Sequence, residues 1–88
     1  MLRKTFQIKN KYGLHARPAA MLVKTTGKFK STIEISKDGL IANGKSIMGL
    51  MTLVAEVGSQ IEVNVDGEDE QAAMEAIEDL IENNFYED

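Results

Sequence analysis

The sequence has no cysteine and no tryptophan, and it has only one histidine and one proline in 88 residues. Without cysteine there can be no disulfide framework, zinc ribbon or thiol nucleophile. One histidine is also too few for an imidazole-rich metal site. Neither a Gly-rich nucleotide-binding loop nor a hydrolase-type nucleophile elbow is present, so we expect no metal and no bound cofactor.

Long apolar runs are absent as well. No stretch approaches the ~18 apolar residues that a membrane span requires. The N-terminus is basic, but no apolar run follows it, so no signal peptide is predicted. The net charge of −4 argues against general nucleic-acid binding. We therefore expect a cytoplasmic protein without membrane insertion and without a nucleic-acid partner.

Basic residues are missing from the second half of the chain. All ten lysines and arginines lie at or before Lys45, together with two of the fourteen acidic residues, and the other acids follow. One end of the molecule could therefore be locally positive while the whole is acidic. A solvated acidic helix with ordinary surface lysines explains the same pattern equally well.

Alternation of apolar and polar residues predicts strands at residues 2–9, 32–36 and 60–65. Asp38-Gly39 predicts a type I′ hairpin turn, which leads into a short strand at residues 40–42.

Three further segments have helical spacing. The predicted helices run from Ala16 to a C-cap at Gly27, from Ser46 onward, and from about Glu70 to Asn83. The predicted apolar faces are Ala16, Ala19 or Ala20 and Val23, with Leu22 at the edge, in the first helix; Ile47, Leu50, Met51 and Val54 in the second; and Ala73, Ile77, Leu80 and Ile81 in the third.

The resulting order is strand, helix, strand, strand, helix, strand, helix. Each strand has one apolar and one polar face, which suits an antiparallel sheet covered on one side only. We therefore expect a single α+β domain over residues 1–88, in which a four-stranded antiparallel sheet carries three helices on one face.

The only histidine lies where a glycine-containing turn meets the first helix. Pro18 is tolerated in a first helical turn, which places His15 at or near the N-cap. The backbone N–H groups of that turn, including that of Ala16, have no intrahelical partner, and the helix dipole adds partial positive charge. Such a position is a ready phosphate site.

Arg17 adds a permanent positive charge whose donor fork matches phosphate oxygens. Imidazole is a usable nucleophile at neutral pH. His15, the N–H groups and Arg17 together indicate a phosphoryl-transfer site. Because no nucleotide loop is present, the phosphoryl donor must be another protein, so we expect a carrier rather than a self-contained enzyme. The alternative is that His15 merely ends a loop and Arg17 is an ordinary surface cation.

Two segments of the sequence resemble one known family. Residues 10–19 (NKYGLHARPA) are similar to the active-site signature of the HPr family, the histidine phosphocarriers of the bacterial sugar phosphotransferase system. Residues 45–51 (KSIMGLM) resemble the regulatory serine segment of that family. The resemblance implies an open-faced β-sandwich of βαββαβα order.

The resemblance also implies a role for the site. His15 would be phosphorylated on Nδ1 by enzyme I, with phosphoenolpyruvate as the source, and would pass the group to enzyme IIA domains. Arg17 would stabilise the phosphohistidine and the transition state of the transfer.

Ser46 lies at a predicted helix N-cap, and capping alone is a sufficient reason for a serine there. The resemblance adds phosphorylation by HPr kinase/phosphorylase. The added charge could repel an acidic partner surface without disturbing the fold.

Met48 lies off the apolar face of its helix, and Met21 is similarly placed on the first helix. Methionine adapts to several partner shapes, which suits a carrier with many partners, although both could equally be core fillers. The predicted docking patch beside His15 comprises Ala20, Met21, Ile47, Met48 and Met51, with Lys24 and Lys45 on its rim. These lysines would steer acidic partners to the site.

Two other functions stay open. The nitrogen-related branch of the family, NPr, shares the His-Ala-Arg-Pro motif, and the acidic-aromatic ending at residues 84–88 resembles that branch. A protein phosphorylated on Ser46 could also act as a co-effector of a transcriptional regulator. No feature of the sequence indicates an oligomer, so we expect a monomer.

Overall fold

The computed structural model describes residues 1–86, so Glu87 and Asp88, the last two residues of the acidic-aromatic ending, lie outside it. The elements are β1 (Leu2–Gln7), α1 (Ala16–Thr26), β2 (Thr32–Lys37), β3 (Leu40–Asn43), α2 (Ile47–Thr52), β4 (Gln60–Asp66), α3 (Glu70–Glu82) and a short 3-10 helix, η1 (Asn84–Tyr86). The predicted order of strands and helices is confirmed, and η1 is the one addition.

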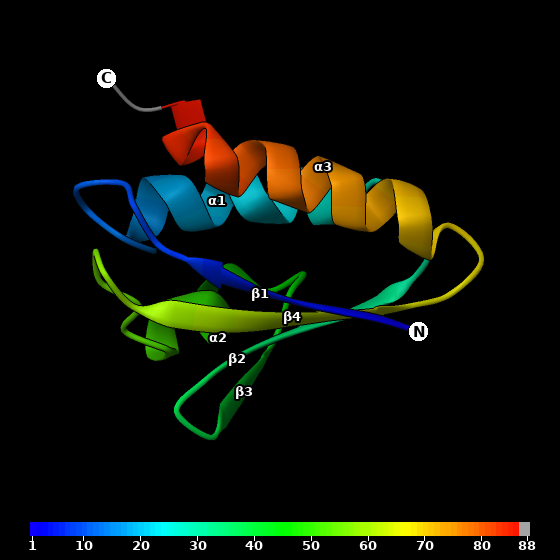
Figure 1. Cartoon of the computed structure of the whole chain (residues 1–88), viewed down its shortest axis with the longest axis horizontal. Helices are drawn as coiled ribbons and strands as arrows, with labels where there is room; N and C mark the ends of the chain where they lie inside the picture. Colours follow the sequence, from blue (N-terminus) through cyan, green and yellow to red (C-terminus); the bar gives the residue numbers. More distant parts are fainter. Residues whose placement is uncertain (87–88) are drawn as a thin grey trace.

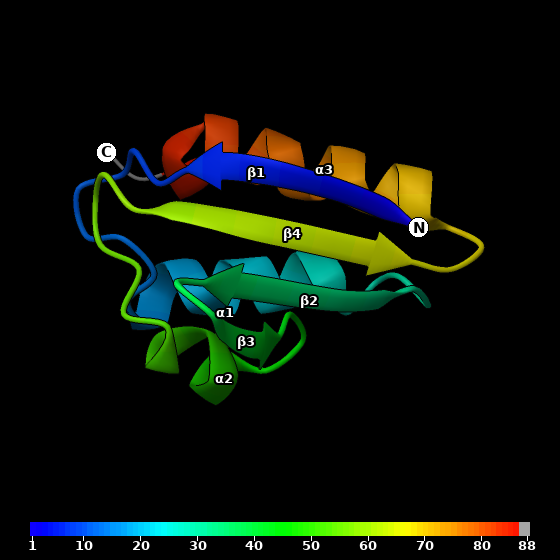
Figure 2. The same cartoon turned by 60° about the horizontal axis from the view of Figure 1, so that its bottom comes forward.

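The four strands form one sheet in the order β1-β4-β2-β3, and every neighbouring pair is antiparallel. Helices α1 and α3 lie side by side over one face of the sheet (Figure 1). The other face carries no helix and is open to view in Figure 2. Helix α2 lies near the edge formed by β3, where it contacts both β3 and α1. The predicted open-faced α+β fold is therefore confirmed.

The alternation predicted for the strands sorts their side chains between the two faces. Ile33 and Ile35 on β2, and Val63 and Val65 on β4, are buried beneath the helices. They lie opposite one another in the register, with Ile33 paired to Val65 and Ile35 to Val63. This arrangement gives the core a continuous apolar floor, on which α1 and α3 pack.

The helical faces agree with expectation throughout α3 and only in part in α1 and α2. Helix α3 buries Ala73, Met74, Ile77, Leu80 and Ile81, which is the predicted face with Met74 added. Helix α1 buries Pro18, Ala19, Leu22 and Thr26, whereas Ala16 is exposed and Val23 only half-buried. The prediction for α1 is confirmed for Ala19 and wrong for Ala16, because Leu22, the larger side chain, lies within the buried face rather than at its edge.

Helix α2 has six residues and buries only Leu50 among them. Ile47, Met51 and Val54, predicted on the same apolar face, are 39%, 41% and 62% exposed. Leu53, at the C-cap, is fully buried instead. A short helix at the edge of the sheet has room to bury one row of side chains, and here that row is Leu50 and Leu53.

Local turn and capping signals are confirmed. Asp38 and Gly39 both have positive φ, 50° and 86°, as a type I′ turn requires. Gly27 is the C-cap of α1, but its φ of −64° is right-handed, so the helix ends in a tightened turn rather than in a left-handed cap. No helix among residues 1–86 is long and apolar enough to cross a membrane.

Candidate phosphoryl-transfer site

His15 is the N-cap of α1. Its backbone is extended (φ −74°, ψ −176°), its side chain makes no capping hydrogen bond, and it is exposed. The first intrahelical hydrogen bond runs from the Ala19 N–H to the His15 carbonyl, at 2.9 Å. The imidazole therefore does not cap the helix, and it is exposed to solvent, where a phosphoryl donor can reach it.

The first turn of α1 presents donors to the space around His15. The N–H groups of Ala16 and Arg17 precede the first intrahelical bond, and Pro18 has no N–H. No acidic residue lies in this turn. Arg17 is exposed and forms no ion pair with any of residues 1–86. An anion at His15 could therefore accept hydrogen bonds from free backbone N–H groups and from a guanidinium that has no ion pair within residues 1–86.

His15 forms one wall of a small pocket of about 190 Å³. The other lining residues are Leu14, Met51, Val54, Ala55 and Glu56. Met51 was expected beside His15, and the structure places it there. Val54, Ala55 and Glu56 were not expected, because they reach His15 only through the tertiary fold and no local motif marks them.

Backbone contacts hold the two walls of this pocket together. The Leu14 N–H donates to the Ala55 carbonyl at 2.8 Å. Gly13 (φ +63°) lies so close that a Cβ there would overlap the Ala55 carbonyl oxygen. Val54 also has positive φ (+49°), which is rare for a β-branched residue. Gly13, two residues before His15, thus permits both the positive-φ turn and the close approach of residues 54–56.

Ser46 is the N-cap of α2, as predicted. Its backbone is extended, and its Oγ accepts a hydrogen bond from the Gly49 N–H at 3.0 Å. The residue is half-buried, and its hydrogen bond to Gly49 is only partly buried.

The predicted docking residues on α1 and α2 are exposed, with the exception of Met21. Met48 is 77% exposed, so it is not a core filler. Ala20, Lys24, Ile47 and Met51 are exposed, while Met21 is half-buried against the core. Since α1 and α2 are in contact, these residues lie on neighbouring helices.

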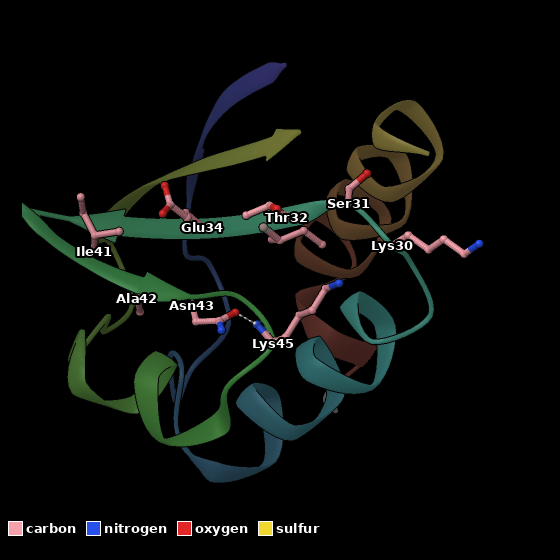
Figure 3. Close-up of a pocket in the computed structure, with 9 residues that line it drawn as sticks. Lys30, Ser31, Thr32, Glu34, Ile41, Ala42, Asn43 and Lys45 are labelled. Carbon is pink, nitrogen blue, oxygen red and sulfur yellow. Dashed lines mark hydrogen bonds between the residues drawn. The ribbon is translucent and has the colours of Figure 1, made fainter. Parts of the chain in front are cut away.

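Lys45 is placed elsewhere. Its Nζ donates to the Phe29 carbonyl at 2.7 Å, beyond the C-terminal end of α1, whereas His15 caps the N-terminal end. Eleven helical residues, roughly 16 Å, separate those two ends. The structure therefore does not bring Lys45 to His15. It lines a second, larger pocket of about 410 Å³, between β2 and β3, which does not include His15 (Figure 3).

Among residues 1–86, no group of three histidine, aspartate or glutamate side chains is arranged to hold a metal ion.

Residues 2–83 match the family model described as "PTS HPr component phosphorylation site". The chain belongs to the HPr family, the phosphocarriers of the phosphotransferase system. The phosphocarrier protein HPr of Xylella fastidiosa (strain Temecula1 / ATCC 700964) is 50% identical over 88 residues, which cover all of this chain and 99% of the relative. The HPr-like protein Crh of Halalkalibacterium halodurans is 50% identical over 82 residues, 93% of this chain and 98% of the relative.

Solved structures of the family have the same fold. The crystal structure of HPr-C-His from Thermoanaerobacter tengcongensis has a TM-score of 0.96 and 48% identity, and the match covers 100% of this chain and 99% of that one. An HPr dimer from the same organism has a TM-score of 0.80 at 48% identity, with 99% and 100% covered.

Proposed function

We propose that His15 accepts a phosphoryl group from phosphorylated enzyme I and passes it to enzyme IIA domains of the phosphotransferase system. The observation that carries this proposal is the exposed imidazole of His15 at the N-terminus of α1, where its side chain has no capping bond. It is the only histidine of a chain that belongs to a phosphocarrier family.

The transfer itself needs no further nucleophile. A lone pair on an imidazole nitrogen, which the family resemblance makes Nδ1, forms the new N–P bond as the bond between phosphorus and the donor breaks, and the departing electron pair stays on the donor. The phosphoryl oxygens then face the N–H groups of Ala16 and Arg17 and the Arg17 guanidinium. These donors are in place before the charge arrives, which is how such sites stabilise a transfer transition state.

The partners would dock on the exposed surface beside His15. We assign to this surface the exposed residues Ala20, Ile47, Met48 and Met51, the half-buried Met21, and Lys24. Methionine side chains adapt to differently shaped partners, which one carrier serving several IIA domains requires. The distant ammonium group of Lys45 makes it a poor candidate for this surface.

Ser46 is the candidate for regulation by HPr kinase/phosphorylase. A phosphate on its Oγ would add about two negative charges at the N-terminus of α2. Relatives include HPr-like proteins named Crh, one of which is titled a catabolite repression HPr. A second role, as a Ser46-phosphorylated co-effector of a transcriptional regulator, would act beside the carrier role, since His15 is present.

The deciding experiment is incubation with enzyme I and ³²P-labelled phosphoenolpyruvate. We expect one acid-labile, base-stable label per chain in the wild type and in Ser46→Ala, and none in His15→Ala. A His15→Ala variant labelled like the wild type would overturn the proposal. Transfer from the labelled protein to a sugar-specific IIA domain, compared with a nitrogen-related IIA domain, distinguishes the sugar branch from the NPr branch.

Two further expectations accompany this function. We expect a cytoplasmic protein and a monomer, although the solved relatives include an HPr dimer and dimers of Crh. Light scattering after gel filtration, which gives the mass of the particle, tests the second expectation directly.

A further inference from the structure

Glu56 is the one carboxylate among the residues that line the His15 pocket. It is exposed, and it makes no ion pair with any of residues 1–86. Glu56 and His15 line the same pocket of about 190 Å³, so the charge of Glu56 acts on an anion bound at His15. A carboxylate with no ion pair among residues 1–86, beside the proposed phosphate acceptor, requires an explanation.

The backbone on both sides of Glu56 is fixed against the segment that leads to His15. On one side the Ala55 carbonyl accepts from the Leu14 N–H at 2.8 Å. On the other side the Gly58 N–H donates to the Ile8 carbonyl at 2.7 Å. The Glu56 carbonyl itself accepts from the Ser59 N–H at 2.9 Å. The main chain at Glu56 is therefore held beside the pocket by these backbone hydrogen bonds.

The charges around His15 are thus asymmetric. The first turn of α1 supplies the free N–H groups of Ala16 and Arg17 and a guanidinium that has no ion pair within residues 1–86, with no acidic residue in the turn. Glu56 lines the pocket from a separate segment, between α2 and β4. A dianionic phosphoryl group would be attracted by α1 and repelled by Glu56.

We propose that Glu56 is a positioning residue, which turns the phosphoryl group on His15 toward α1 and raises the free energy of the phosphorylated state. This inference rests on the proposed function of His15. The carboxylate forms no bond in the reaction, since the N–P bond forms on the imidazole and the bond to the donor breaks as described above. Its effect is to make the carrier release the group more readily to an acceptor.

The test measures the equilibrium between phosphorylated and free protein, not the rate of phosphorylation. The protein is incubated with catalytic enzyme I at fixed ratios of phosphoenolpyruvate to pyruvate, and the phosphorylated fraction is measured by native electrophoresis or mass spectrometry. In Glu56→Gln the ratio of phosphorylated to free protein should rise about threefold to tenfold, because a like-charge repulsion is removed. The rise should shrink at 0.5 M salt, which screens exposed charges.

Three variants serve as controls. Glu34→Gln removes the same charge from an exposed position on β2 outside the His15 pocket, and it should leave the ratio unchanged. Glu56→Asp should restore the wild-type ratio in part, and Glu56→Lys should raise it beyond Glu56→Gln. Circular dichroism checks that each variant is folded.

The outcomes separate the two proposals. If the wild type takes no label at all, the proposed function of His15 fails. If the wild type is labelled and Glu56→Gln has an unchanged or lower ratio, the role of Glu56 is overturned while that of His15 stands. A slower approach to an unchanged ratio would make Glu56 a docking residue and would likewise overturn the inference.

Discussion

At the scale of single residues, Arg17 is the simplest test of how the site handles charge. Its guanidinium is exposed and has no ion pair within residues 1–86, so it holds no part of the fold together. We expect Arg17→Gln to slow labelling by enzyme I by about 100-fold, the scale of losing one preorganised donor. The midpoint of urea unfolding should stay unchanged.

Arg17→Lys keeps the charge but loses the planar fork, so it should recover only part of the rate. The rate of ³²P incorporation at saturating enzyme I gives the comparison. A full rate in Arg17→Gln would mean that the N–H groups of α1 suffice for the phosphoryl group.

Val54 tests whether the wall of the pocket is strained. Its φ of +49° is costly for a β-branched residue, by about 1–2 kcal/mol. Glycine removes that strain at an entropic cost of about 0.5–1 kcal/mol. Because Val54 is 62% exposed, little burial is lost, and Val54→Gly should raise the free energy of unfolding by about 0.5 kcal/mol.

The matched control for Val54 is Val57, which is 57% exposed and has no positive φ. Val57→Gly should lower the free energy of unfolding, since it adds only the entropic cost. Urea denaturation of both variants gives the two signs. If Val54→Gly is destabilised as much as Val57→Gly, the strain argument is wrong.

At the scale of elements, Asp69 connects the start of α3 to the start of β2. Its carboxylate accepts hydrogen bonds from the Lys30 N–H (2.8 Å), the Ser31 N–H (3.0 Å) and the Ser31 hydroxyl. These bonds, that of the Ser31 side chain first, hold the pKa of Asp69 below its ordinary value of 3.8. The ionised carboxylate therefore stabilises the folded chain.

The pH dependence follows from that direction. A carboxyl group whose pKa is lowered by folding stabilises the protein fully above its unfolded pKa. The stabilisation is lost as the pH falls from about 3.8 through the lower folded value. Asp69→Asn should therefore unfold at lower urea than the wild type at pH 7, and the gap should close as the pH falls through this range. A gap that does not narrow as the pH falls below 3.8 would contradict the prediction.

The elements also show what local sequence could and could not predict. The Asp38-Gly39 turn and the caps at His15 and Ser46 were predicted because each depends on the chemistry of neighbouring residues. The buried side of α2 was predicted only in part, since Leu50 was expected there but Leu53 was not. Spacing allowed two apolar rows, and only packing against β3 and α1 selected the row of Leu50 and Leu53.

The candidate site likewise contains residues that the sequence places together and residues that only the fold brings to His15. His15 and Arg17 share one helix start, and the proline after them marks it, so sequence alone could place them together. Val54, Ala55 and Glu56 lie about forty residues further along the chain. They meet His15 only because the Leu14–Ala55 and Ile8–Gly58 hydrogen bonds join two loops at one end of the sheet.

At the scale of the whole molecule, folding rearranges the uneven charge of the sequence. Lysines of the N-terminal segment pair with acids of α3: Lys4 with Glu78, and Lys9 with Glu82. Ion pairs thus join the basic start of the chain to the acidic helix α3. Lys24, in the last turn of α1, by contrast, is exposed and has no ion pair within residues 1–86.

This difference predicts which cation steers a partner. Lys24→Gln should slow labelling by sub-saturating enzyme I about two- to fivefold at low salt, because it removes an uncommitted charge from the docking side. Lys4→Gln changes the net charge equally but removes a charge already paired with Glu78, so it should have little effect. The Lys24 effect should nearly vanish at 0.5 M salt, where the Debye length is only a few ångströms. Equal slowing by the two variants would show that net charge, rather than its placement beside α1, controls the encounter.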